Sequence, residues 1–254
     1  MVGHYHEPMP PAAHDGPRIA FFGGSFDPPH RGHLTIARAA QIALSLDTVL
    51  FAPVGAQPLK PDGSTASFQD RVAMTRLAIA GEPNFALSLA DAPKPANTTK
   101  HAPNYTIDTL LALKQELPNH ATLFCLMGAD SFLALRRWHR GAEIPFVAPL
   151  IVASRPGENL EDLADALPAG LSLEPCSSSS TAVSAIELRT CTLHSAAGAT
   201  APFHLLPGLY IDISATAIRE EMHSEVARIP AGEGHHSDLP DAVFDYIAAH
   251  NLYR

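Results

Sequence analysis

Short runs of consecutive apolar residues alternate along this chain with longer segments in which apolar residues recur at helical spacing. The short runs span residues 19–22, 48–51, 85–89, 123–127, 150–153 and 208–213. The helical segments span residues 33–46, 67–81, 106–117 and 240–250, and one more begins after residue 213. Continuous apolar strands alternating with helices are typical of a parallel sheet that is buried on both faces. The pattern therefore predicts an α/β fold with helices on both faces of the sheet.

The chain length of 254 residues suits one α/β domain. Residues 1–17 contain four prolines and three histidines with little periodic apolar content, so we expect a flexible tail followed by a single domain over residues 18–254. Two stretches interrupt the alternation. We expect loop insertions at the serine-rich residues 176–206 and at residues 224–237, which hold glycines and histidines.

Charge and cysteine content exclude several classes of protein. Lys and Arg number 17 against 26 Asp and Glu, a formal charge of −9, which argues against a nucleic-acid-binding surface but not against a small phosphorylated ligand. With no apolar stretch of ~18 residues and no secretory leader visible, we expect no membrane partner and a cytoplasmic location. Cys125, Cys176 and Cys191 form no C-x-x-C pair, so we expect neither a disulfide framework nor a zinc cage.

The first chemical motif, residues 23–33, reads G-G-S-F-D-P-P-H-R-G-H and joins the first strand to the first helix. Ligands of open parallel sheets bind at the carboxyl ends of strands, and Gly23 and Gly24 let backbone amides approach an anion. His30 and His33, three residues apart, fall on one side of the helix start, where protonation is unfavourable unless an anion lies between them. The alternatives are a tight turn with two surface histidines, or an H-x-x-H metal pair that lacks an obvious third ligand.

The second motif, residues 213–220, reads I-S-A-T-A-I-R-E. Ser214 is a good N-cap, and Thr216 and Arg219 share one face of the helix that follows. A cation in the first turns of a helix opposes the helix dipole, and an anionic ligand would resolve that conflict. The alternative is an ordinary capped helix in which Arg219 pairs with a carboxylate.

Both motifs resemble signatures of the nucleotidyltransferase superfamily, G-G-[ST]-F-D-P-x-H-x-G-H and I-S-[AS]-T-x-[IL]-R, and are similar to those of bacterial nicotinate-nucleotide adenylyltransferases. The resemblance implies a Rossmann-like, doubly wound parallel sheet. It also implies adenylyl transfer from ATP to nicotinate mononucleotide in NAD biosynthesis, giving nicotinate adenine dinucleotide and pyrophosphate. His30, His33 and Arg219 would be the catalytic residues, with the histidines binding the triphosphate and stabilising the transition state.

Shorter segments extend the resemblance: P-x-K at residues 58–60, A-P-N-Y-T at 102–106, G-A-D at 128–130 and R-P-G at 155–157. Taken singly, these fit a solvated charge, helix caps or ordinary packing. Taken with the family, they imply an ATP site at Gly23, Gly24, Ser25, Phe26, Lys60, Gly128, Asp130, Ser214, Thr216 and Arg219. They imply a mononucleotide site at Tyr105, Thr106, Trp138 and Arg155.

The implied cofactor is Mg²⁺, carried mainly by the ATP phosphates and without a confident protein side-chain ligand. ATP and nicotinate mononucleotide are the expected partners, while the oligomeric state stays open. A related transferase acting on phosphopantetheine or on an amide-form mononucleotide is one alternative. A non-catalytic nucleotide-binding regulator is another, although the intact His30, His33 and Arg219 argue against it.

Overall fold

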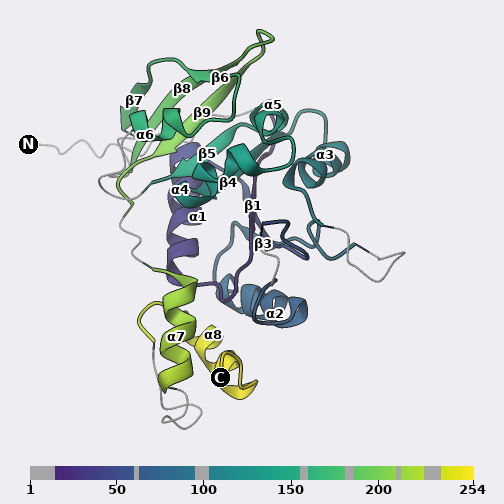
Figure 1. Cartoon of the computed structure of the whole chain (residues 1–254), viewed down its shortest axis with the longest axis vertical. Coiled ribbons are helices and arrows are strands. Elements are labelled where there is room, and N and C mark those ends of the chain that lie inside the picture. Colours follow the sequence, from purple (N-terminus) through teal and green to yellow (C-terminus); the bar gives the residue numbers. More distant parts are fainter. Residues whose placement is uncertain are drawn as a thin grey trace, which may run out of the picture.

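The computed structural model describes residues 15–59, 63–94, 103–154, 160–180, 186–209, 213–225 and 236–254 (Figure 1). Its elements, in chain order, are β1 (Arg18–Gly24), α1 (Arg31–Leu44), β2 (Thr48–Pro53), α2 (Phe68–Ala78), β3 (Phe85–Leu87), α3 (Thr106–Glu116), β4 (Thr122–Gly128), α4 (Ala129–Leu133), the 3-10 turns η1 (Leu135–Arg137) and η2 (Gly141–Glu143), α5 (Ile144–Val147), β5 (Leu150–Ala153), α6 (Leu160–Asp165), β6 (Leu171–Leu173), β7 (Ser177–Ser180), β8 (Glu187–Ser195), β9 (Thr200–Leu206), α7 (Ala215–Glu225) and α8 (Asp241–Ala249).

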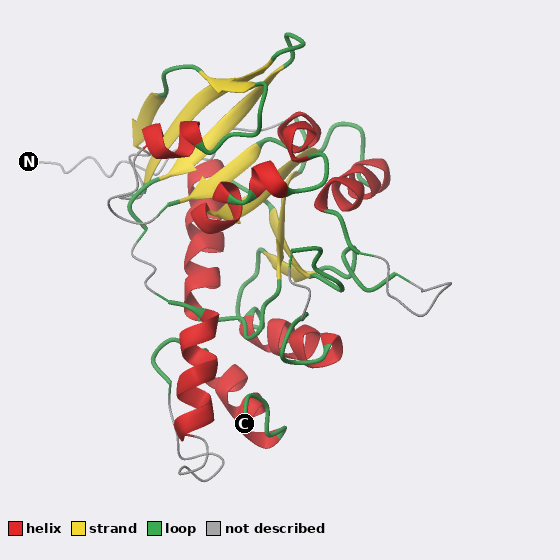
Figure 2. Ribbon diagram, viewed as in Figure 1, coloured by secondary structure: helices red, strands yellow, loops and turns green. Residues whose placement is uncertain are grey.

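The strands form one sheet with the order β3-β2-β1-β4-β5-β9-β8-β6, and β7 pairs with β8 (Figure 2). Every pairing from β3 through β9 along that order is parallel, and the pairings of β8 with β9, β6 and β7 are antiparallel. The chain runs outward from β1 to β2 and β3, then crosses to β4 on the other side of β1. This reversal is the switch point of a doubly wound sheet, which confirms the predicted Rossmann-like fold.

Alternate residues of β1 point into two different cores, which explains why its sequence is continuously apolar. Ala20 and Phe22 pack with Leu34 and other residues of α1 on one face of the sheet. Phe21 packs on the opposite face with Ile107 of α3. All of these side chains are at most 5% exposed. A strand buried on both faces has no polar side to show, so its register is set by the sheet and not by alternation.

A third apolar cluster lies away from the sheet and joins the middle of the chain to its end. It includes Met74 of α2, Ile218 and Met222 of α7, and Val243 and Ile247 of α8. Figure 1 shows these three helices gathered at one end of the molecule. The cluster brings the last residues of the chain close to the loop that follows β1.

The expectation of a loop at residues 176–206 was wrong. β7, β8 and β9 occupy most of this stretch, and β9 continues the parallel sheet beside β5. The physical reason is burial on both faces of the sheet: Leu188 packs in one core, Cys191 and Leu193 pack in the other, and all three are at most 7% exposed. The strand expected at residues 208–213 is not seen in its described part, because residues 207–208 form a turn; residues 210–212 lie outside the described residues.

The expectation that the cysteines form no disulfide was wrong for one pair. Cys176 and Cys191 are joined by a disulfide, whereas Cys125 is free and buried. Ser177 pairs with Thr190 in the antiparallel register of β7 on β8, which sets the preceding residue opposite Cys191. Spacing in the sequence carried no sign of this pairing, because strand register alone creates it.

Several expectations concern residues whose placement is not described. They are the first 14 residues of the expected tail at 1–17 and positions 226–235 of the expected loop at 224–237. Within the described part of the chain, no helix is both long and apolar enough to cross a membrane.

Candidate active site

A cavity of about 860 Å³ opens where β1, β4 and β5 end and where α1, α3 and α7 begin. This is the carboxyl edge of the sheet at the switch point, where ligands of such folds bind. The predicted site residues that line the cavity are Gly23, Gly24, Ser25, Phe26, His30, His33, Tyr105, Thr106, Gly128, Asp130, Trp138, Ser214, Thr216 and Arg219. The two remaining candidates, Lys60 and Arg155, lie outside the described residues.

The two histidine rings of the first motif lie in contact at the start of α1, with their planes tilted by 34°. Their ring centroids are 3.7 Å apart, and the backbone N–H of His30 donates to Nδ1 of His33 at 3.2 Å. Because Nδ1 of His33 accepts a hydrogen bond, the neutral ring carries its proton on Nε2. His33 therefore has one N–H that is not used to cap its own helix and can serve a ligand in the cavity.

Both imidazoles are held neutral in the ligand-free protein. Burial lowers the pKa of His30 to about 4, and the charge of Asp238 acts in the opposite direction. Burial, followed by the neighbouring His30, lowers the pKa of His33 well below its usual value. An anion entering this pocket would favour the protonated rings and raise both values. The pair is therefore suited to contact phosphate oxygens.

The loop between β1 and α1 is held in an unusual backbone conformation by packing. Phe26 has φ of 47°, a left-handed conformation that is uncommon for a bulky residue. Its ring lies 4.9 Å from that of His33 and 5.6 Å from that of Phe22. A Cβ on Gly24 would come within 3.2 Å of the Phe26 ring. The glycine thus leaves room for the aromatic side chain as well as for a ligand.

Asp27 fixes the same loop from its buried carboxylate. Its two oxygens accept hydrogen bonds from the backbone N–H groups of Thr65 (2.7 Å) and Ala66 (3.0 Å). The hydroxyl of Tyr253 donates a third, at 2.8 Å. The side chain is 5% exposed, so these bonds offset the cost of removing a carboxylate from water. Asp27 is thereby a structural anchor of the motif, a role that the sequence analysis did not assign.

Arg71 is a second anchor that the sequence analysis missed. It is 2% exposed, and its guanidinium donates to the backbone oxygens of Ser25 at 2.7 Å and Val54 at 2.8 Å. These bonds tie the end of β2 to the first residues of the motif. Nothing in the helical pattern of α2 distinguishes this arginine from a surface charge.

Arg219 reaches from α7 to the first motif. Its Nη1 donates to the backbone oxygen of Asp27 at 2.7 Å, and its Nη2 donates to the hydroxyl of Thr216 at 3.2 Å. The alternative in which Arg219 pairs with a carboxylate is not what these contacts show. The two motifs, 192 residues apart, meet through this side chain.

The start of α3 contributes the other side chains expected to contact a nucleotide. Tyr105 is its N-cap residue, and the Tyr105 ring lies 4.3 Å from that of His139, centroid to centroid. Trp138, Arg137 and His139 also line the cavity. The cavity lining further includes Gln57, Asp91, Asn104 and Ser154, none of which was predicted to be a site residue.

No group of three or more His, Cys, Asp or Glu side chains is placed to hold a metal ion within the described residues. The carboxylate oxygens of Asp27 are already engaged with hydrogen-bond donors. The donor set that the cavity offers fits anions better than a metal held by the protein alone.

Comparisons with known proteins agree with this geometry. Residues 21–221 match the model of the family described as cytidylyltransferase-like. The "Probable nicotinate-nucleotide adenylyltransferase" of Laribacter hongkongensis is 38% identical over 240 residues, covering 94% of this chain and 96% of that protein. The protein of the same name in Gloeobacter violaceus is 37% identical over 238 residues, covering 94% of this chain and 97% of that protein.

Solved structures give the same fold at lower identity. The nicotinic acid mononucleotide adenylyltransferase of Plasmodium falciparum complexed with NaAD has a TM-score of 0.62 at 16% identity, covering 93% of this chain and 97% of that chain. At this identity the likeness concerns the fold.

Proposed function

The chain belongs to the cytidylyltransferase-like family and, within it, to the nicotinate-nucleotide adenylyltransferases, and on that premise we propose how its cavity performs the reaction. The enzyme transfers the adenylyl group of ATP to nicotinate mononucleotide. The products are nicotinate adenine dinucleotide, used in NAD biosynthesis, and pyrophosphate.

The main support for these roles is that residues expected to bind ATP and residues expected to bind the mononucleotide line a single cavity of about 860 Å³. His30, His33 and Arg219 belong to the two ATP motifs, and Tyr105 and Trp138 belong to the mononucleotide segments. Bringing two reactants into one enclosed site removes much of the entropic barrier to their encounter.

The chemistry requires no covalent intermediate with the protein. An oxygen of the mononucleotide 5′-phosphate attacks the α-phosphorus of ATP and forms the new P–O bond. The bond from the α-phosphorus to the oxygen that bridges to the β-phosphorus breaks, and pyrophosphate leaves with the electron pair. No proton has to move between these ionised phosphates, so catalysis rests on positioning and on charge stabilisation.

Residues of the two motifs supply most of that stabilisation. His33 offers its Nε2–H, and His30 lies 3.7 Å away, ring centroid to ring centroid. Arg219 brings a permanent charge whose place is set by Asp27 and Thr216. The glycines and Ser25 and Phe26 form the floor of the ATP phosphate site, with Lys60 as a further cation. Gly128, Asp130 and Ser214 complete the proposed ATP site.

Mg²⁺ would arrive on the ATP phosphates, where it neutralises charge. Water would supply most of its remaining ligands, as small hard Mg²⁺ often requires. For the mononucleotide, the first backbone N–H groups of α3 at Tyr105 and Thr106 would receive the pyridine carboxylate, Trp138 would stack on the ring, and Arg155 would pair with the phosphate. A cytoplasmic location is part of the same proposal.

Pyrophosphate release with ATP and a panel of acceptors tests the function. We expect release with nicotinate mononucleotide and much less with nicotinamide mononucleotide or phosphopantetheine. The dinucleotide product should form in equal amount to pyrophosphate. Release with phosphopantetheine alone would move the chain to another branch of the superfamily, and tight ATP binding without release with any acceptor would indicate a regulator.

A further inference from the structure

A buried carboxylate lies behind the first turn of α3, outside every motif recognised in the sequence. Asp91 follows β3, is 4% exposed and lines the cavity. Burying a carboxylate is costly unless donors surround it. The donors that surround this carboxylate therefore indicate what Asp91 does beside the cavity.

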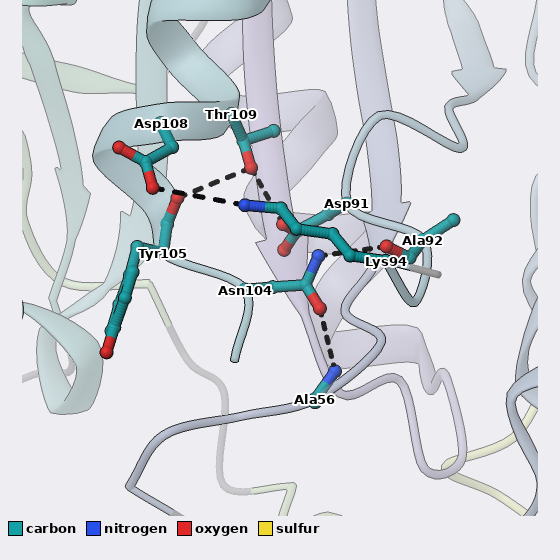
Figure 3. A network of polar contacts seen from close by, with 8 residues as sticks. All are labelled: Ala56, Asp91, Ala92, Lys94, Asn104, Tyr105, Asp108 and Thr109. Atoms are coloured by element: carbon teal, nitrogen blue, oxygen red, sulfur yellow. Dashed lines mark hydrogen bonds and ion pairs between the residues drawn. The ribbon is translucent and has the colours of Figure 1, made fainter. Parts of the chain in front are cut away.

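The side-chain donor to the Asp91 carboxylate is Thr109 of α3. Its hydroxyl donates to Oδ1 at 2.8 Å, within the network drawn in Figure 3. Burial raises the pKa of Asp91, and the hydrogen bond from the side chain of Thr109 acts in the opposite direction. The backbone oxygen of Asp91 also accepts from the N–H of Gly55 at 2.8 Å, just after β2. Asp91 thus links α3 to the segment that follows β2.

Asn104, next to the helix N-cap, makes the same link twice more and adds a third bond to the segment that follows β3. Its backbone N–H donates to the oxygen of Ala56 at 2.9 Å, and its Oδ1 accepts from the N–H of Ala56 at 3.0 Å. Its Nδ2 donates to the oxygen of Ala92 at 2.9 Å. The side chain is 4% exposed. Together these bonds clamp the entry to α3 against two neighbouring loops.

The clamp determines where the start of α3 stands relative to the cavity. The first turn of any helix leaves N–H groups without partners inside the helix, and in α3 these include those of Tyr105 and Thr106. Figure 3 shows the Tyr105 ring pointing away from the clamp, and that ring lines the cavity. Loss of these contacts of Asp91 and Asn104 would let both the N–H groups and the Tyr105 ring move.

We propose that Asp91 is a positioning residue for the pyridine mononucleotide, which it serves by holding Thr109, next to the contacts of Asn104, and so fixing the first turn of α3. The inference rests on the proposed function, since it assigns that turn to the nicotinate. It gives Asp91 no contact with the reacting phosphates and no part in ATP binding.

The test is steady-state kinetics on full-length Asp91→Ala and Thr109→Val, each with both substrates varied. We expect KM for nicotinate mononucleotide to rise about tenfold, which corresponds to about 1.4 kcal/mol. KM for ATP and kcat should stay close to wild type. Asp91→Asn should recover most of the loss, because its amide oxygen still accepts from Thr109.

Two comparisons separate positioning from a general structural role. Asp108→Ala removes an exposed carboxylate of the same helix, paired with Lys94 at 3.9 Å, and should leave both KM values unchanged. The double variant Asp91→Ala with Thr109→Val should have the same KM for nicotinate mononucleotide as Asp91→Ala alone. Each substitution removes the same hydrogen bond, the one between Thr109 and Asp91.

Equal rises in both KM values together with a lower Tm would overturn the proposal, as would an unchanged KM for the mononucleotide in a folded Asp91→Ala. An inactive wild-type enzyme is a different result: it would overturn the proposed function, and the positioning role with it. If Asp91→Ala does not fold, Thr109→Val decides the question by the same KM split, and Asp91→Asn should stay close to wild type.

Discussion

The hydroxyl of Tyr253 donates a hydrogen bond of 2.8 Å to Oδ1 of Asp27, and the two residues are 226 positions apart in the chain. Tyr253 is the penultimate residue and is 8% exposed. Asp27 lies in the first motif, and its backbone oxygen accepts from Arg219. The C-terminus therefore supports the loop that carries His30 and His33.

Tyr253→Phe should lower kcat by about tenfold without unfolding the protein, because it leaves a buried carboxylate with one donor fewer. Tyr246→Phe is the matched control. It also removes a tyrosine-to-aspartate hydrogen bond, to Asp70 at 3.0 Å, but that bond joins α8 to α2 and not to the motif. Kinetics and thermal unfolding of both variants check this, and equal turnover in the two would contradict the supporting role.

His33→Ala should lose activity by a factor on the order of 10²–10³, the effect of one preorganised donor at a transition state. The fold should persist, because the imidazole faces the cavity. Turnover and circular dichroism measure the two effects, with His120→Ala, an exposed histidine, as the control. Near wild-type turnover in a folded His33→Ala would reject the catalytic role.

Arg219→Lys should lose activity by about tenfold or more although the charge is kept, since an ammonium cannot reproduce a planar fork of donors. In the structure that fork already spans Asp27 and Thr216. The exposed Arg76→Lys on α2 should behave as wild type. The measurement is kcat/KM for ATP, and equal values for the wild type and Arg219→Lys would exclude a role for the guanidinium geometry.

The enzyme should prefer nicotinate over nicotinamide mononucleotide by at least about tenfold in kcat/KM, which needs roughly 1.4 kcal/mol. A carboxylate gains charge-assisted hydrogen bonds from the helix N–H groups, whereas an amide would set its own NH₂ donors against them. Side-by-side kinetics at saturating ATP check this. Parity between the two substrates would contradict the placement of the ring at the start of α3.

Stability should fall as the pH is lowered below about 6.5, in part through His204. Burial, with Arg18 as a second cause, lowers the pKa of His204 from 6.5 to about 4. Between pH 6.5 and pH 4, His204 binds a proton more readily in the unfolded chain than in the folded one. The free energy of unfolding therefore decreases as the pH falls, and the contribution of His204 near pH 4 is a loss of about 3 kcal/mol relative to pH 7.

Denaturant unfolding at pH 7 and pH 5 measures this effect. His204→Gln keeps a partner for the Thr190 hydroxyl, which lies 3.1 Å from Nδ1, but removes the titrating ring. The stability difference between the two pH values should be smaller in the variant. An unchanged difference would mean that His204 does not titrate as its burial implies.

Much of the fold could be predicted from local pattern. The helices at α1 and α3 and the strands at β1, β4 and β5 lie within two residues of their expected bounds, because continuous apolar runs and helical spacing are local signals. The serine-rich stretch was different. β8 and β9 depend on pairing with each other and with β5, and serine content alone favoured a loop.

Within the chain's own sequence, two motifs were enough to predict residues that line one cavity, because the glycines, histidines and arginine that bind phosphates sit at short, regular spacings. Only the tertiary structure decided what holds them in place. Arg71, Asp91 and Tyr253 look like ordinary residues in the sequence, yet each is buried against the cavity loops or the start of α3. Their roles depend on contacts between distant segments, and such contacts exist only once the sheet and its helices have packed.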